Sequence, residues 1–142
     1  SLLSLGVFAQ GIDSEKREKI EAFKRTYITM KLDFTTEEAE SFWPVYNEFD
    51  KARHELGQSA PKPFTDGKEP GDYSEKELEE ILDQFLNHEQ SMIDLKYEYI
   101  NKFKEVLPLE KVVQLGMIEA EFRREIMEKF SGKREGGFKS GK

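Results

Sequence analysis

Apolar residues recur every three or four positions along four separate segments of this 142-residue chain. That spacing places them on one face of an α-helix. The alternation at every second position that a half-buried strand needs is missing. We therefore predict an all-α fold with helices over about residues 14–31, 35–56, 74–106 and 108–131.

Each segment has a predicted core face. The faces are Ile20, Phe23, Tyr27 and Met30 in the first segment and Phe42, Val45, Tyr46, Phe49, Ala52 and Leu56 in the second. In the third segment they are Leu78, Ile81, Leu82, Phe85, Met92, Leu95, Tyr99 and Phe103, widened by Ile93, Tyr97 and Ile100. In the fourth they are Val112, Leu115, Ile118, Phe122, Ile126 and Phe130.

The second segment carries a complete helix-start signal. Thr35 is a natural N-cap, Glu38 completes a capping box, and Phe34 can pack against Ala39 as a hydrophobic staple. Pro44, further along, removes a backbone donor, so the helix is expected to kink or to split there. The neighbouring Trp43, the only tryptophan, either packs beneath this bend or lies at a dimer interface.

The third segment has the same kind of start, with Ser74 and Glu77 as the capping box and Tyr73 against Leu78 as the staple. The stretch before it, residues 57–72, holds three prolines and three glycines. It is a loop that is either mobile or functional, and the sequence favours a mobile loop.

Composition limits the function classes. The net charge of −7 argues against nucleic acid as a partner, because phosphate binding needs a basic field. The absence of cysteine removes disulfides, thiolate nucleophiles and sulfur-ligated metals. With 37% hydrophobic and 36% charged residues, one modest core and self-association are expected.

The two ends of the chain differ from its centre. Residues 1–9 are apolar and end in small residues before Gln10, as at the end of a signal peptide, so we expect export to the periplasm. The alternative is an ordinary N-terminal strand or helix. Residues 10–131 are predicted to form one helical domain, which Gly132 ends, and residues 132–142 a disordered tail. No stretch has the length and apolarity of a membrane span.

Three cations recur at intervals of seven in the first segment, namely Arg17, Lys24 and Lys31, with Ile28 among them. This cationic ridge beside apolar residues can hold non-native chains by charge and by burial of side chains. The alternative is a solvated face paired with neighbouring glutamates.

Catalysis has little support. His54 and His88 are each followed by glutamate, but neither has the second histidine of a zinc helix. Asp50 and His54, one turn apart, leave a weak case for a metal site. Paired carboxylates lie on helical faces without a nucleophile or a base nearby. We expect no enzyme activity and no cofactor.

Two motifs carry a family resemblance. Phe34-Thr35-Thr36-Glu37-Glu38 opens one predicted helix and Leu107-Pro108-Leu109-Glu110-Lys111 opens another. This order resembles the Spy/CpxP-like periplasmic family, in which LTxxQ motifs open two helices, and especially its members labelled sensor of ECF-type sigma factor. Here Phe34 replaces the leading Leu and Glu38 the Gln, while Pro108 and Lys111 replace Thr and Gln.

The resemblance implies a hooked or curved helical hairpin that forms an antiparallel homodimer. It also implies either a chaperone for unfolded envelope proteins or a stress-regulatory partner of a membrane sensor or anti-sigma protein. A metal-responsive sensor is a weaker alternative. The family's chaperones present a basic concave surface, whereas this chain is acidic overall.

Overall fold

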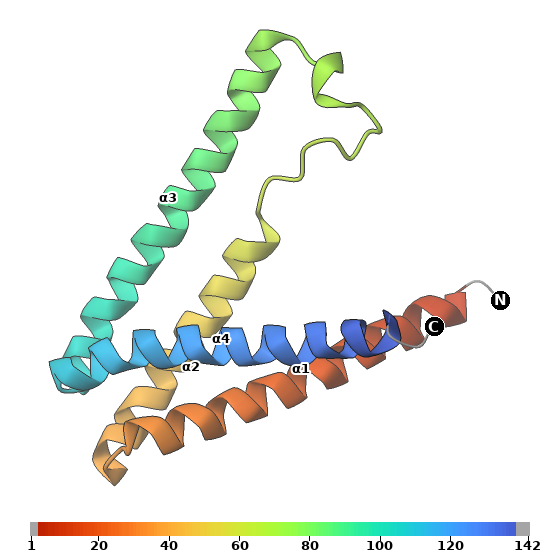
Figure 1. Ribbon diagram of the computed structural model, residues 1–142. Coiled ribbons are helices and arrows are strands. Elements are labelled where there is room, and N and C mark those ends of the chain that lie inside the picture. Colours follow the sequence, from red (N-terminus) through yellow and green to blue (C-terminus); the bar gives the residue numbers. More distant parts are fainter. Residues whose placement is uncertain (1–2, 139–142) are drawn as a thin grey trace. The chain divides into compact units, whose positions relative to one another are not determined.

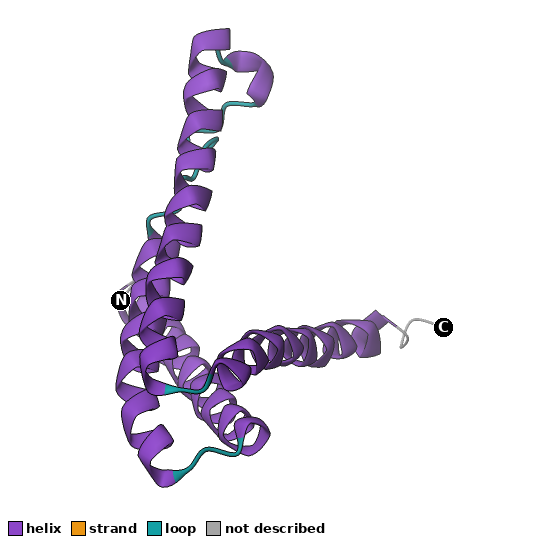
Figure 2. Ribbon diagram, turned by 90° about the vertical axis from the view of Figure 1, so that its left-hand side faces the viewer, coloured by secondary structure: helices purple, strands orange, loops and turns teal. Residues whose placement is uncertain are grey.

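The computed structural model describes the backbone of residues 3–138 and the side chains of residues 14–129 (Figure 1). Its elements are α1 (Leu3–Leu32), α2 (Thr36–Gln58), the short 3-10 helix η1 (Pro70–Asp72), α3 (Glu75–Val106) and α4 (Leu109–Phe138). Residues 3–138 contain no strand, which confirms the all-α prediction. Within these residues, the connection between α2 and α3 is longer than the other connections between helices (Figure 2).

The helix starts follow the local signals. α2 begins at Thr36, which puts Thr35 at the N-cap position. At α3 the Ser74 hydroxyl accepts the Glu77 N–H at 3.2 Å, and the Glu77 carboxylate accepts the Ser74 N–H at 2.8 Å. The capping box predicted for α3 is therefore confirmed.

Two helix boundaries differ from the prediction. α4 continues past Gly132 to Phe138, so the expected end at Gly132 is wrong. A single glycine inside a helix costs only about 1 kcal/mol relative to alanine and does not by itself end it. α1 begins at Leu3 rather than near Ser14. The expected signal-peptide cleavage concerns residues whose side chains lie outside the described part of the chain.

Pro44 does not split its helix. α2 runs through it as one element, and Pro44 lies on the exposed side. The Glu40 carbonyl, four residues earlier, has no Pro44 N–H to accept, but Glu40 is itself exposed. The missing bond therefore falls where water can replace it.

Helix contacts divide the chain into two compact units, each described here by itself. One unit pairs α1 with α4, and the other pairs α2 with α3. The single domain predicted over residues 10–131 stays a prediction.

The core of the α2–α3 unit is aromatic. Phe103 of α3 has ring centroids at 5.4 Å from Phe42 and 5.9 Å from Phe49, both in α2. Phe49 also stacks on Tyr99 at 4.9 Å. These rings and Tyr46 are all buried, which confirms three of the six residues predicted for the face of α2. The other three are only partly buried, namely Val45, Ala52 and Leu56. The contacts pair rising numbers in α2 with falling numbers in α3, so the two helices run in opposite directions.

In the α1–α4 unit the buried residues of α4 are four of those predicted from its periodicity, namely Val112, Leu115, Ile118 and Phe122. The face of α1 differs from the prediction. Ile28 and Leu32 are buried, whereas Met30 is 77% exposed. Met30 lies about 160° round the helix from Ile28 and cannot share its face.

A lysine closes the turn after α1. Asp33, just beyond the last residue of α1, has φ 49°, a left-handed cap that aspartate tolerates better than most residues. Its carbonyl accepts a hydrogen bond from Lys111 Nζ at 3.0 Å. Lys111, in the first turn of α4, thus links the end of α1 to the start of α4.

The segment between α2 and α3 is internally bonded. The Tyr73 hydroxyl donates to Asp66 Oδ1 at 2.9 Å, and the Tyr73 ring meets Phe64 edge-on at 5.5 Å. Gly67 has φ 80°, which glycine adopts without strain. Tyr73, predicted to staple α3, therefore contacts its own loop, and the loop has a defined local structure.

Candidate binding surfaces

The cationic ridge of α1 is partly covered. Arg17 and Lys31 are exposed, but the Lys24 side chain is only 15% exposed and lies 4.0 Å from Glu21. Ile28 is fully buried, so it is a core residue and is not offered to a client. This corrects the expectation that Ile28 forms part of a surface strip. The three cations keep their spacing, and a binding role for them stays a prediction.

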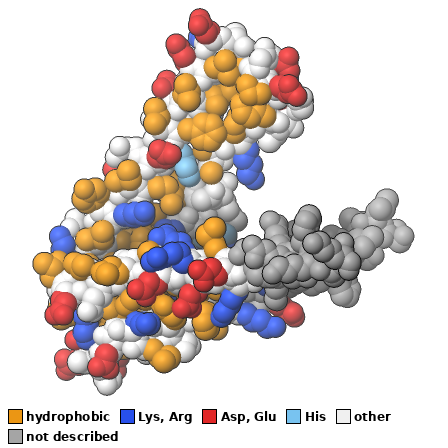
Figure 3. Space-filling view, viewed as in Figure 1, with side chains coloured by type: hydrophobic (Ala, Val, Ile, Leu, Met, Phe, Trp, Pro, Cys, Tyr) orange, Lys and Arg blue, Asp and Glu red, His pale blue; other side chains and the backbone are white. Residues whose placement is uncertain are grey.

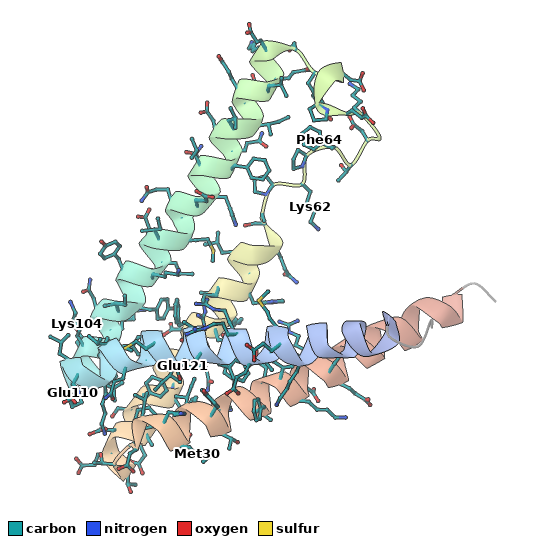
Figure 4. The ribbon with its side chains drawn as sticks, in the orientation of Figure 1. Met30, Lys62, Phe64, Lys104, Glu110 and Glu121 are labelled. Atoms are coloured by element: carbon teal, nitrogen blue, oxygen red, sulfur yellow. The ribbon has the colours of Figure 1, made fainter. Side chains whose placement is uncertain are left out.

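Beside this ridge an aromatic cluster joins α1 to α4. The rings of Phe23, Tyr27 and Phe122 lie 5.5–6.2 Å apart. Burial of the Tyr27 hydroxyl, together with the charges of Glu125 and Glu121, raises its pKa. The hydroxyl donates to Glu121, a residue of α4 labelled in Figure 4, at 3.4 Å. The cluster stabilises the α1–α4 pair and keeps its polar edge at the surface.

Lysines cover the faces of two of these rings. Lys129 Nζ lies 4.4 Å from the Phe23 centroid, and Lys31 Nζ lies 5.5 Å from that of Tyr27. Both distances are within the range of cation–π attraction. Lys31, one of the ridge cations, therefore already has an intramolecular contact.

Two of the residues predicted to form the start and bend of α2, Trp43 and Phe34, contact other side chains of this chain. Trp43 is half-buried, with its ring edge-on to Phe42 at 4.9 Å and to Tyr46 at 5.6 Å. This geometry agrees with the packing role considered for Trp43. Phe34 lies beneath Lys111 Nζ, at 5.9 Å from the ring centroid.

The largest exposed apolar surface of the α2–α3 unit follows α3. We call it the apolar stripe of α3 and define it as Leu82, Leu86, Ile93, Tyr97 and Ile100, with exposures of 41–67%. Figure 3 shows hydrophobic side chains gathered over the part of the molecule where α3 begins. Long apolar rows are seldom left exposed on a protein surface, so this row is a candidate binding surface.

Four residues of this stripe, Leu82, Ile93, Tyr97 and Ile100, were predicted to belong to the core, and Leu86 was placed in no predicted face. At about 100° per residue, the five side chains lie about 80–140° from the line through Tyr99 and Phe103. A single partner helix does not cover so wide an arc. The expected burial of Leu82, which is 60% exposed, is therefore wrong. The angular width of the row was the signal that could have revealed it.

The structure does not support the metal site considered for Asp50 and His54. Asp50 accepts a hydrogen bond from Arg53 Nη2 at 2.9 Å, while His54 is exposed. Among the described residues, no three His, Asp or Glu side chains are grouped closely enough to hold a metal ion.

Comparisons of the chain with models of protein families, with curated proteins and with solved structures gave no match. Within the part of the chain that the structure describes, no helix is both long enough and apolar enough to cross a membrane. The exposed surfaces of the molecule are therefore the basis for its proposed function.

Proposed function

We propose that this protein is a non-enzymatic binding protein that holds segments of other polypeptides, as a chaperone of unfolded envelope proteins does. The observation that carries the proposal is the apolar stripe of α3, whose first two residues, Leu82 and Leu86, are each at least 60% exposed. Unfolded chains expose apolar side chains, and contact with such a row removes apolar surface of both partners from water.

The cationic ridge is the second part of the proposal. Arg17 and Lys31 are exposed at the α1 surface and can attract acidic stretches of a client, with Lys24 contributing from its partly covered position. Ile28 has no part in this contact because it is buried.

Suppression of client aggregation tests both surfaces. Light scattering of a chemically unfolded client, diluted into buffer with and without the full chain, measures holding activity. We expect the Leu82→Ser/Leu86→Ser variant to lose most of the suppression and the Arg17→Glu/Lys24→Glu/Lys31→Glu variant to lose it for acidic clients. Met30→Ser, at another exposed apolar position, is the control. Full suppression by the stripe variant would remove the stripe from the proposal.

The regulatory role is separated from the chaperone role by breadth of binding. A pulldown from the native envelope, with and without unfolding stress, should recover many unrelated proteins if the chain is a chaperone. A single saturable partner that is released under stress would instead support regulation of a membrane sensor or anti-sigma protein.

We also propose that the chain forms an antiparallel dimer through the second half of α3, where Ile93, Tyr97 and Ile100 are exposed. A two-fold axis near Tyr97 would bring these residues of two copies together and bury them. Multi-angle light scattering should give twice the monomer mass for the wild type and the monomer mass for Tyr97→Glu. A wild-type monomer at high micromolar concentration would refute the dimer.

Export to the periplasm completes the proposal, and it rests on the sequence of residues 1–9. N-terminal sequencing of protein from the native host should begin at Gln10. An intact Leu2 in the mature protein would remove the argument for cleavage.

A further inference from the structure

The first half of α3 exposes apolar side chains that α2 does not cover. Leu82 and Leu86 are 60% and 61% exposed, and Phe85 is 40% exposed. One helical turn separates Leu82 from Leu86, and Phe85 lies between them in the sequence, so the three lie on adjoining positions of one face. They form a compact apolar face suited to holding one or two anchoring side chains of a partner.

The surroundings of this face are acidic. Residues 75–94 hold seven carboxylates against one lysine, Lys76, a formal charge of −6 in a chain whose total is −7. All seven carboxylates belong to exposed residues. Glu77 and Asp94 have local hydrogen bonds to Ser74 and Gln90.

Three of the carboxylates flank the apolar face directly. Glu79, Asp83 and Glu89 lie within about 100° of Leu82 round the helix. Within residues 14–129 the structure gives these three no ion pair. Their charge is therefore not balanced by neighbouring side chains and is available to a partner.

We propose that this acidic apolar face, made of Leu82, Phe85 and Leu86 with Glu79, Asp83 and Glu89, docks a basic amphipathic segment of another protein. Apolar residues of the segment cover the leucines and Phe85, while its lysines and arginines pair with the flanking carboxylates. The inference rests on the proposed binding function and names its partner class: clients or partners rich in Lys and Arg.

A second copy of the chain fits this face poorly. Two-fold pairing brings identical patches together, so two acidic faces would oppose each other without neutralisation. The face has no positive charge to balance its carboxylates, and a basic segment supplies that charge. The proposed dimer through Ile93, Tyr97 and Ile100 leaves this face open.

Peptide binding to the full chain tests the inference. Three fluorescein-labelled peptides of one length share the same apolar residues and carry Lys, Gln or Glu at the remaining positions. Fluorescence anisotropy should show the Lys peptide binding at least tenfold tighter than the Glu peptide in low salt. That preference should shrink in 0.5 M salt, because screening shortens the range of exposed charges.

Variants of the protein identify the residues that contact the peptide. Glu79→Gln/Asp83→Asn/Glu89→Gln should weaken binding of the Lys peptide at least fivefold, and Leu82→Ser/Leu86→Ser should weaken all three peptides. The matched control, Glu55→Gln/Glu105→Gln/Glu110→Gln, changes the net charge equally at exposed positions elsewhere and should keep the wild-type affinity. Circular dichroism verifies that each variant keeps its helices.

The outcomes separate the two proposals. Equal affinity for the Lys and Glu peptides, or equal weakening by the control variant, overturns the inference and leaves the binding function intact. Binding of no peptide together with no suppression of client aggregation overturns both. Conversion of a wild-type dimer to a monomer by Leu82→Ser/Leu86→Ser also overturns the inference, since the face would then be the homodimer interface.

Discussion

At the scale of single residues, the half-buried Lys111 makes a contact that stabilises the α1–α4 unit. Its ammonium satisfies the carbonyl of Asp33, the left-handed residue that ends α1. Lys111→Met keeps most of the side-chain length and removes the donor. We expect a loss of about 1 kcal/mol in the free energy of unfolding, the usual worth of such a bond.

Chemical denaturation followed by circular dichroism measures the effect of Lys111→Met. Lys104→Met, at an exposed lysine of α3 (Figure 4), is the control and should change stability by less than about 0.5 kcal/mol. Equal losses in the two variants would show that the bond to Asp33 contributes nothing.

The stabilising contact between Asp66 and Tyr73 in the loop depends on pH. The Tyr73 hydroxyl, with help from the Lys68 N–H, lowers the pKa of Asp66 below its ordinary 3.8. Because the folded pKa is lowered, the contact contributes fully above pH 3.8 and is lost as the pH falls through the lowered value.

Removing the Tyr73 hydroxyl should reverse that shift. In Tyr73→Phe the pKa of Asp66 should rise toward 3.8, as measured by NMR titration of its carboxyl carbon. Tyr97→Phe loses the same group from an exposed position and should leave Asp66 unchanged. An unchanged pKa in Tyr73→Phe would mean that the loop contact is absent in solution.

Ile28 shows where residue-level reasoning from the sequence fails. Its spacing from Lys24 and Lys31 suggested a surface ridge, yet the side chain is buried. The sequence of a helix does not specify which other helix will pack against it. Burial of a residue at the border between an apolar and a charged face therefore depends on the partner helix.

At the scale of helices, Phe103 holds α3 to α2. It is 1% exposed and contacts the rings of Phe42, Tyr46 and Phe49. Phe103→Ala should cost about 3–5 kcal/mol, because it removes a large buried ring and leaves a cavity. Met30→Ala, at a 77% exposed position, should stay within about 0.5 kcal/mol of the wild type. Thermal and urea unfolding measure both, and similar midpoints for the two variants would contradict the aromatic core.

Helix starts were predictable, and helix faces were predictable only in part. Ser74 and Thr35 mark starts through short-range hydrogen bonding that the sequence specifies locally. Gly132 was mistaken for an end because a glycine signal is weak without a following proline. Most of the stripe of α3 was assigned to the core because periodicity reports an apolar face and not the area of the helix that packs against it.

At the scale of the whole molecule, the pairing of helices could not be read from periodicity. All four segments are amphipathic, and nothing local specifies that α1 pairs with α4 and α2 with α3. The contact of Tyr27 with Glu121 spans 94 positions. Such pairings follow from the packing of complete surfaces rather than from any short motif.

That pairing predicts the result of cutting the loop. Lys68 is exposed between α2 and η1 and is not followed by a proline, so brief treatment with trypsin should cleave first after Lys68. Each of the two resulting fragments contributes one helix to each pair. We expect two bands on a denaturing gel but one species by native mass spectrometry. Lys68→Gln should resist this first cleavage, and separation of the fragments would contradict the two helix pairs.

The link between α1 and α4 also bears on how the protein is made. A ribosome releases α1 before α4, but in this unit α4 is the helix that packs against α1. The nascent chain therefore exposes the apolar face of α1 until α4 has been synthesised. A protein proposed to bind unfolded chains is thus itself incompletely folded during that interval.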